Sequence, residues 1–253
     1  MFDLSGRKAL VTGAGQGMGV GIAECLAALG ATVIINDLSE KKAQRTAALL
    51  REKQFKAEAK AFDVTNLPAF VDAVASVGGV DILVNNAGIV RVADPTEHFS
   101  NFFDTDPANW QKQFDLNVFG VMNGAKAVLP GMRERQWGRF VTVSSDSGRK
   151  GGEGLSIYGA AKAAGLQFSK CLATEEGRHG ITSNTVSLGL MENAASTDDP
   201  GLSTYFKALL ERTPVSRPGT GHDVGAAISY LCSEESAWVT GQNLAVNGGF
   251  DTF

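Results

Sequence analysis

The chain has 253 residues, of which 43% are hydrophobic and 20% charged, proportions that are ordinary for a globular protein with a full core. Its 27 acidic and 23 basic side chains give a formal net charge of −4. No basic tract predicts a nucleic-acid partner. The cysteines are odd in number and far apart, at 25, 171 and 232, which favours free thiols in a reducing compartment.

Targeting, membrane and metal signals are missing from the sequence. The N-terminal residues lack the apolar core of a signal peptide, and no stretch is long and apolar enough to span a bilayer. We therefore expect a cytoplasmic protein without a membrane partner. The three histidines lack metal-ligand spacing, so we expect no metal site.

The first predicted unit is a strand, a glycine-rich turn and a helix. Residues 8–12 form a short apolar run, followed by TGAGQGMG at 12–19 and an apolar-periodic segment through Leu29. Glycines alone indicate only a tight turn, but between a strand and a helix they allow a pyrophosphate to reach the helix N-terminus. We therefore predict dinucleotide binding by Gly13, Gln16, Gly17, Met18 and Gly19.

Asp37 follows the second apolar run, residues 31–36. A carboxylate at about this distance from the glycine turn accepts hydrogen bonds from the adenosine ribose and repels a 2′-phosphate. Its neighbours Gln16 and Leu38 are uncharged, so we predict NAD rather than NADP, with Asp37 and Leu38 at the adenosine. The alternative is that Asp37 caps the next helix, as Ser39 also could. That helix carries cations that fit a solvated face: Lys41, Lys42 and Arg45.

Five more strand-like runs, the first of them weaker, alternate with helix-like segments, and most end in polar or small residues. The runs span residues 55–62, 81–84, 139–144, 181–187 and 242–246. This alternation predicts an α/β fold in a single domain, residues 1–253, with a doubly wound, mostly parallel seven-stranded sheet and helices on both faces. Because the carboxyl ends of parallel strands share one edge, the residues that follow them belong to one site.

Longer segments between these runs carry further expectations. Residues 90–107 are polar and aromatic and form either a wall of the substrate pocket or a subunit contact. Residues 109–135 predict one long helix, with Asn117 within it. Residues 190–213 predict a lid over the site. The apolar tail, residues 249–253, fits a subunit contact or a terminus that folds back.

Tyr158 and Lys162 are four residues apart, a spacing that places both on one face of a helix. An ammonium near the phenol lowers the tyrosine pKa from about 10 and makes it a usable base. Ser144 and Ser145 end the strand before it and could donate to the same oxygen. Alone, such a pair is usually a surface tyrosine packed on a lysine stem.

In this order, the motifs resemble the short-chain dehydrogenase/reductase family along essentially the whole chain. They are TGAGQGMG at 12–19, NNAG at 85–88, Asn117, Ser145 with YGAAK at 158–162, and VTGQNLAVNGG at 239–249. The resemblance implies a Rossmann-like sheet, a nicotinamide cofactor, a homotetramer and a catalytic set of Asn117, Ser145, Tyr158 and Lys162. It favours Ser145 over Ser144 as the catalytic serine, because Ser145 precedes Tyr158 by the number of residues that the family pattern has.

The resemblance also implies cofactor contacts beyond the glycine turn. Tyr158 and Lys162 are expected at the nicotinamide ribose. The chain departs from the family after its sixth strand, where Leu188 replaces the usual proline and Asn193 the usual threonine. The remaining implied contacts are Asp63, Val64, Asn86, Ala87, Gly88, Gly189, Met191 and Asn193.

These features predict an NAD-dependent oxidoreductase that interconverts a secondary alcohol and its ketone by hydride transfer, with Tyr158 as the general acid/base. One alternative is an NADPH-dependent 3-ketoacyl-thioester reductase with the same catalytic residues. Another, from a different class, is a non-catalytic NAD-binding sensor or scaffold. The expected partner is a small alcohol or ketone, whose identity the sequence does not specify.

Overall fold

The computed structural model describes residues 2–88, 100–192 and 200–252. It is built on one seven-stranded sheet of order β3-β2-β1-β4-β5-β6-β7. Each pair of neighbours is parallel, so the predicted doubly wound sheet is confirmed. The strands are β1 Lys8–Val11, β2 Thr32–Asp37, β3 Ala57–Ala61, β4 Ile82–Asn85, β5 Gly138–Ser145, β6 Ile181–Leu188 and β7 Asn243–Val246.

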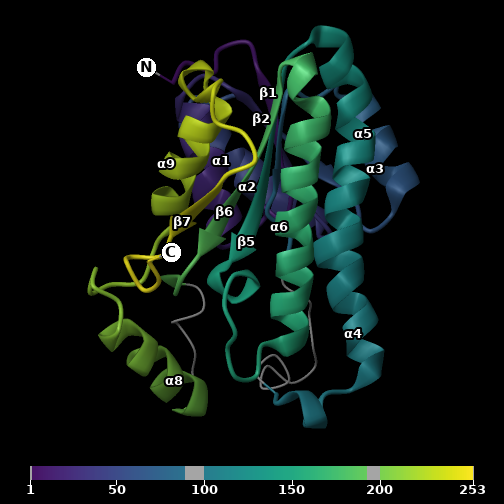
Figure 1. The fold of residues 1–253 in the computed structure, drawn as a ribbon. Helices are drawn as coiled ribbons and strands as arrows, with labels where there is room; N and C mark the ends of the chain where they lie inside the picture. The colour runs from purple at the N-terminus through teal and green to yellow at the C-terminus, as the bar shows by residue number, and fades with distance from the viewer. Residues whose placement is uncertain (1, 89–99, 193–199, 253) are drawn as a thin grey trace.

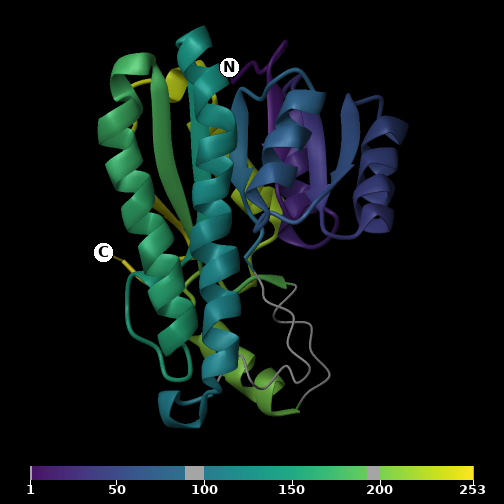
Figure 2. The same cartoon turned by 90° about the vertical axis from the view of Figure 1, so that its right-hand side faces the viewer.

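Helices cover both faces of this sheet (Figures 1 and 2). One face carries α1 Met18–Ala28, α2 Glu40–Glu52 and α9 Gly221–Cys232. The other carries α3 Leu67–Ser76, α5 Gly120–Arg135 and α6 Ser156–Glu176. Within the described ranges, no helix has the length and apolar character needed to cross a membrane.

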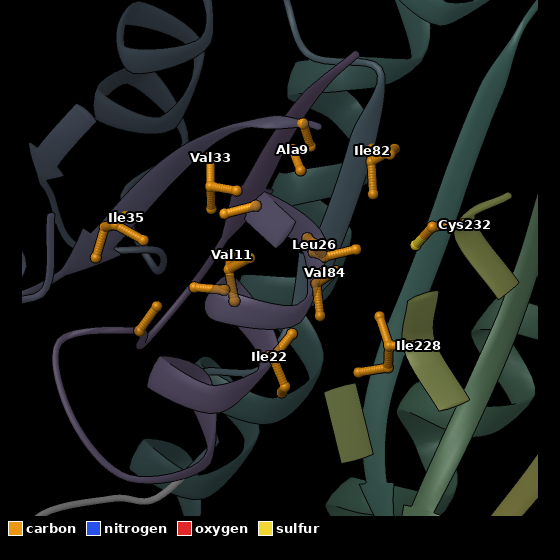
Figure 3. Close-up of a cluster of buried hydrophobic side chains, with 14 of the residues drawn as sticks. Ala9, Val11, Ile22, Leu26, Val33, Ile35, Ile82, Val84, Ile228 and Cys232 are labelled. Carbon is orange, nitrogen blue, oxygen red and sulfur yellow. The ribbon is translucent and has the colours of Figure 1, made fainter. Parts of the chain in front are cut away.

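The core has two parts because successive residues of each strand face opposite helix layers. Ala9 and Val11 of β1 pack with Ile22 and Leu26 of α1 on one side (Figure 3). Leu10, between them in the chain, belongs to the cluster on the other side. Strands covered on both faces read as continuous apolar runs, which is why the sequence identified them.

The helical segment predicted at 109–135 is not one continuous helix. It consists of α4 Pro107–Phe114, a π-helical turn over Asp115–Phe119, and α5. The wider turn contains Asn117, which is buried. A π-helical turn inserted between helices is frequent at functional sites.

The chain reverses its direction of winding between β1 and β4, which are neighbours in the sheet. A crevice forms at such a switch point beside the carboxyl ends of the strands. In Figure 1 the arrows of β5 and β6 point toward the end of the molecule where α8, Pro200–Glu211, lies. The loops that carry the predicted site residues therefore gather at this end.

Candidate active site

A cavity of about 1340 Å³ lies at this edge of the sheet. It runs from loops after β1, β2 and β3 to loops after β5 and β6 and to α8. Gly19 and Asn117 do not line it, and Asn193 lies outside the described residues. The predicted site residues that line it are Gly13, Gln16, Gly17, Met18, Asp37, Leu38, Asp63, Val64, Asn86, Ala87, Gly88, Ser145, Tyr158, Lys162, Gly189 and Met191.

The glycine turn is held against the loop after β4. Gly13 has a φ of 62°, and a Cβ there would lie 2.9 Å from the Cα of Ala87, so a larger residue would separate the two loops. The Asn86 amide donates to the carbonyl oxygens of Thr12 and Gly13 at 2.9 and 3.2 Å. These bonds fix the floor of the cavity at the switch point.

The first turn of α1 faces this cavity without a capping side chain. Gly17 is the N-cap residue and supplies no side-chain cap, and the Val20 amide donates back to the Gly17 carbonyl oxygen at 3.2 Å. Free amide N–H groups at a helix N-terminus bind anions such as a pyrophosphate. The arrangement fits the dinucleotide that the sequence predicted.

Asp37 lies at the end of β2 and is 7% exposed. Its Oδ1 accepts a hydrogen bond from the amide of Ser39 at 2.9 Å. Its Oδ2 faces the glycine turn, since a Cβ on Gly15 would fall 2.6 Å from it. One carboxylate oxygen therefore accepts a hydrogen bond within the protein, and the other lies beside the cavity, where a ribose hydroxyl could donate to it.

Lys42 lies closer to this part of the cavity than its place on a solvated helix face suggested. Its ammonium donates to Oε1 of Gln16, a cavity residue. A Cβ on Gly15 would lie 2.7 Å from Cβ of Lys42. The contact spans separate elements, so the sequence carried no signal for it.

Ser145 ends β5 and accepts two hydrogen bonds from Ser147, one from its amide at 3.3 Å and one from its hydroxyl at 2.9 Å. A hydrogen bond between Ser145 and the Tyr158 phenol lowers the pKa of that phenol, although burial has a larger effect. Ser144 is buried and donates to the carbonyl oxygen of Lys162 at 3.4 Å. Only Ser145 therefore has its hydroxyl directed to Tyr158.

Tyr158 and Lys162 lie on α6, with the Lys162 ammonium 5.7 Å from the Tyr158 ring centroid. Burial raises the pKa of Tyr158 to about 12 and lowers the pKa of Lys162 to about 8. The predicted lowering of the Tyr158 pKa by Lys162 is therefore wrong for this structure. Loss of hydration outweighs the other effects, and the ammonium donates to the carbonyl oxygen of Val143 at 3.1 Å.

Asn117 lies behind Lys162, outside the cavity wall. Its amide nitrogen donates to the carbonyl oxygen of Gln113 at 3.0 Å and to Oε1 of the same residue at 3.2 Å. Its Oδ1 is buried and accepts no hydrogen bond from the described residues. Both this oxygen and the Lys162 ammonium lie beside Gly88. A buried acceptor next to an ammonium suits a polar relay or a bound water.

The other half of the cavity combines residues from the segment predicted as a lid, 190–213, with side chains that the sequence did not assign to the site. Phe250 turns inward and lines the wall, so the tail folds back onto this chain. Tyr205, Phe206 and Leu209 of α8 also line it. Charged groups at this end are Asp146, Lys150, Glu153 and Arg212. No group of three metal-ligating side chains occurs in the part of the chain that the structure describes.

Comparison with known proteins gives the family of the chain. The family model described as enoyl-(acyl carrier protein) reductase matches residues 13–251. A 3-oxoacyl-[acyl-carrier-protein] reductase of Vibrio cholerae is 37% identical over 256 residues, covering 98% of each protein. Nodulation protein G of a Rhizobium species is 38% identical, also over 98% of each.

Solved structures show the same relationship. A gluconate 5-dehydrogenase from Burkholderia cenocepacia, in complex with NADP and tartrate, matches with a TM-score of 0.88 and 35% identity over 98% of this chain and 96% of its own. A 3-oxoacyl-[acyl-carrier protein] reductase from Brucella melitensis with bound NAD matches with a TM-score of 0.90 and 31% identity over 99% and 94%. Because the family model and these relatives cover nearly the whole chain, the protein belongs to the short-chain dehydrogenase/reductase family of nicotinamide-dependent oxidoreductases.

Proposed function

We propose that the protein uses NAD to interconvert a secondary alcohol and its ketone. The observation that carries this proposal is one continuous cavity that joins the glycine turn and Asp37 to Ser145 and Tyr158. A dinucleotide and a small substrate placed in it would lie side by side, as hydride transfer requires. When bound, the nicotinamide would accept or supply the hydride.

Side chains of the protein itself can transfer the proton that the alcohol loses and the ketone gains. With a pKa of about 12, Tyr158 is a phenol at neutral pH, so it can donate its proton to a ketone oxygen and recover it in the reverse reaction. Ser145 donates a second hydrogen bond to that oxygen. With a pKa of about 8, Lys162 is mostly cationic at neutral pH, and its ammonium, 5.7 Å from the Tyr158 ring centroid, places a positive charge beside the reacting groups.

Asp37 supports NAD over NADP. Its Oδ2 faces the cavity and can accept a hydrogen bond from a ribose hydroxyl, whereas a 2′-phosphate there would meet a negative charge. Leu38, the next residue, is 66% exposed and uncharged. Asp63 accepts two hydrogen bonds from Thr65, which hold the loop at the expected adenine contact in place.

A second candidate is an NADPH-dependent reductase of 3-oxoacyl thioesters. It is favoured by the printed activity of the Vibrio cholerae relative, which is 37% identical. The gluconate 5-dehydrogenase match favours a hydroxy acid instead. A non-catalytic NAD sensor is the least supported reading, because a scaffold has no need for Ser145, Tyr158 and Lys162 in one cavity.

The test is reduction of NAD and of NADP, followed by absorbance, with secondary alcohols, hydroxy acids and 3-hydroxyacyl thioesters. We expect turnover with NAD, and loss of turnover in Tyr158→Phe. Tyr230→Phe is the matched control, because Tyr230 lies on α9 and contacts Phe2 rather than the cavity. Near-full turnover by Tyr158→Phe, or tighter binding of NADP than of NAD, would reject the proposal.

The predicted cytoplasmic homotetramer remains a proposal. Exposed apolar groups support an assembly: Trp238 is fully exposed, and Leu244 of the edge strand β7 is 40% exposed. A contiguous exposed apolar patch marks a subunit interface, and these two side chains are the contacts that we expect such an interface to cover. Light scattering on the purified protein would give the number of subunits.

A further inference from the structure

The substrate half of the cavity contains two cations brought together by the folded-back tail. Lys150 follows the 3₁₀ turn Asp146–Gly148, and Arg212 follows α8. The Lys150 ammonium lies 4.1 Å from the Phe250 ring centroid, and the Arg212 guanidinium carbon lies 5.2 Å from it. All three side chains line the cavity that also contains Tyr158. One aromatic ring therefore holds two positive groups at the wall of the reaction chamber.

The two cations differ in how their charge is balanced. Lys150 faces the Asp251 carboxylate at 3.7 Å. Arg212 has no carboxylate within ion-pair distance among residues 2–88, 100–192 and 200–252, and its guanidinium donates no hydrogen bond to them. It contacts the face of Phe250, an interaction that does not use the N–H donors at the edge of the guanidinium.

The described acids that line this end of the cavity, Asp146 and Glu153, do not pair with Arg212. Asp146 accepts a hydrogen bond from Asn247 at 2.9 Å and faces Arg149 at 3.9 Å. Glu153 lines the cavity and influences Tyr205, as Arg212 does, but it forms no ion pair with Arg212 within the described residues. Among the described residues, no carboxylate balances the positive charge that the guanidinium presents to the cavity.

An exposed arginine often needs no partner, and a solvated surface side chain is the simplest explanation for most of them. Two observations distinguish Arg212. It lines the same cavity as Tyr158, and its position is set by an aromatic ring that also holds a second cation. A planar guanidinium fixed in this way binds a carboxylate through two parallel hydrogen bonds.

We propose that Arg212, assisted by Lys150, binds a carboxylate of the substrate, so that the enzyme acts on a hydroxy acid and the corresponding keto acid. The inference rests on the proposed function of the cavity, because it assumes that the substrate reacts at Tyr158. The carboxylate lies at the end of the cavity formed by α8 and the tail, and the alcohol carbon at the end formed by Ser145 and Tyr158. The subsite selects among substrates and takes no part in proton or hydride transfer.

Binding of a non-reacting acid tests the subsite without turnover. Malonate and its neutral diamide would be titrated by calorimetry into NAD-saturated protein. We expect malonate to bind and the diamide not to bind. Arg212→Gln should weaken malonate binding by about ten- to a hundred-fold, and Lys150→Gln by less. Lys207→Gln is the matched control, since it removes one exposed cation from α8 without touching the cavity.

Kinetics provide a second readout. In Arg212→Gln, KM for hydroxy acids should rise with kcat nearly unchanged, because a remote binding contact is lost equally in ground and transition states. KM for the matching amides should not change, and Arg212→Lys should retain part of the affinity. Equal malonate binding by wild type and Arg212→Gln, or equal binding of malonate and its diamide, would overturn the inference. If malonate binding depends on Arg212 while no alcohol is oxidised, the proposed function fails and the subsite stands.

Discussion

The hydroxyl of Ser147 donates a hydrogen bond to the Oγ of Ser145 at 2.9 Å. The Ser147 amide donates to the same oxygen at 3.3 Å. A serine hydroxyl has two acceptor positions and one proton. With both acceptor positions used by Ser147, the proton of Ser145 is left to donate to Tyr158 or to a substrate oxygen.

Ser147→Ala should therefore reduce kcat while leaving the fold intact. One neutral hydrogen bond contributes about 0.5–1.5 kcal/mol, so we expect a fall of about two- to ten-fold, with little change in KM. Steady-state kinetics would measure it. Ser76→Ala is the control, since that hydroxyl bonds within α3, remote from the cavity. A kcat equal to wild type would show that Ser147 does not position Ser145.

The buried Lys162 should weaken the fold at neutral pH. Its pKa falls from 10.5 to about 8 in the native protein. Below pH 8 the buried amine is charged, and this lowers the free energy of unfolding. Between pH 8 and 10.5 the native amine is neutral while the unfolded one is still charged. The destabilisation caused by the buried charge therefore declines as the pH rises through this range. Lys162→Met should therefore be more stable by up to about 3 kcal/mol below pH 8, although inactive.

Thermal unfolding of wild type and Lys162→Met from pH 6 to pH 10 would measure this effect. The difference in Tm should be largest below pH 8 and should shrink toward pH 10. The lost hydrogen bond to the Val143 carbonyl oxygen reduces the gain without changing its pH dependence. A difference that is constant with pH would contradict the role of the buried charge.

The sequence predicted the sheet and the edge that carries the site because the signals for both are local. Buried parallel strands read as apolar runs, so residues 181–187 anticipated β6, which spans Ile181–Leu188. The convergence of residues after these strands follows from parallel topology alone. Asp37 and Ser145 could therefore be assigned to one site without any knowledge of their distance.

What the sequence missed depends on contacts between distant segments or on burial. Phe250 meets Lys150 and Arg212 only after the tail has folded back. The π-helical turn at Asp115–Phe119 has no residue pattern of its own. The helical periodicity of residues 109–135 continues across it, so the sequence predicts a single helix there. The pKa of Tyr158 is set mainly by burial, which cannot be predicted from the four-residue spacing between Tyr158 and Lys162.

Gly88 should tolerate no side chain. A Cβ there would lie 2.9 Å from Oδ1 of Asn117 and would contact the Lys162 ammonium. Gly88→Ala should therefore displace Lys162 and lower kcat by at least about ten-fold, since catalytic alignment tolerates little displacement. Gly177→Ala is the control, because nothing lies within 4 Å of a Cβ at that position. Equal kcat values for the two variants would show that the lysine can move at no cost.

Asp223 should stabilise the start of α9. It accepts hydrogen bonds from both Arg217 guanidinium nitrogens, at 2.7 and 2.8 Å, and from the Thr220 amide at 2.8 Å. These bonds lower the pKa of Asp223, with Arg217 contributing most. Since the ion pair is partly exposed, Asp223→Ala should cost about 1–2 kcal/mol, mainly through the lost cap.

The pH dependence of this effect has a definite sign. A carboxyl with a lowered native pKa stabilises the fold above its unfolded pKa of about 4, and the stabilisation declines as the pH falls below that value. The difference in Tm between wild type and Asp223→Ala should therefore shrink in acid. Asp72→Ala on α3 is the control for loss of an exposed carboxylate. A difference that grows in acid would exclude this role.

Asp37 should determine the choice between NAD and NADP, and Lys42 should determine what happens when Asp37 is removed. Asp37→Ala removes both a ribose acceptor and the charge that repels a 2′-phosphate. We expect the ratio of kcat/KM for NAD to that for NADP to fall by about 10- to 100-fold, the effect of one like-charge contact near a protein surface. Lys42, held beside the cavity through Gln16, is then free to pair with the phosphate.

The double variant Asp37→Ala with Lys42→Ala separates the two effects. If Lys42 binds the phosphate, the added mutation should return much of the lost ratio by raising KM for NADP, and KM for NAD should change little. Lys42→Ala alone should have a small effect if, as we propose, Asp37 excludes NADP. Such non-additive effects are expected when two side chains act on the same group of the ligand, here the 2′-phosphate of NADP. Additive effects on the ratio would mean that Lys42 is only a surface cation, as its place on α2 first suggested.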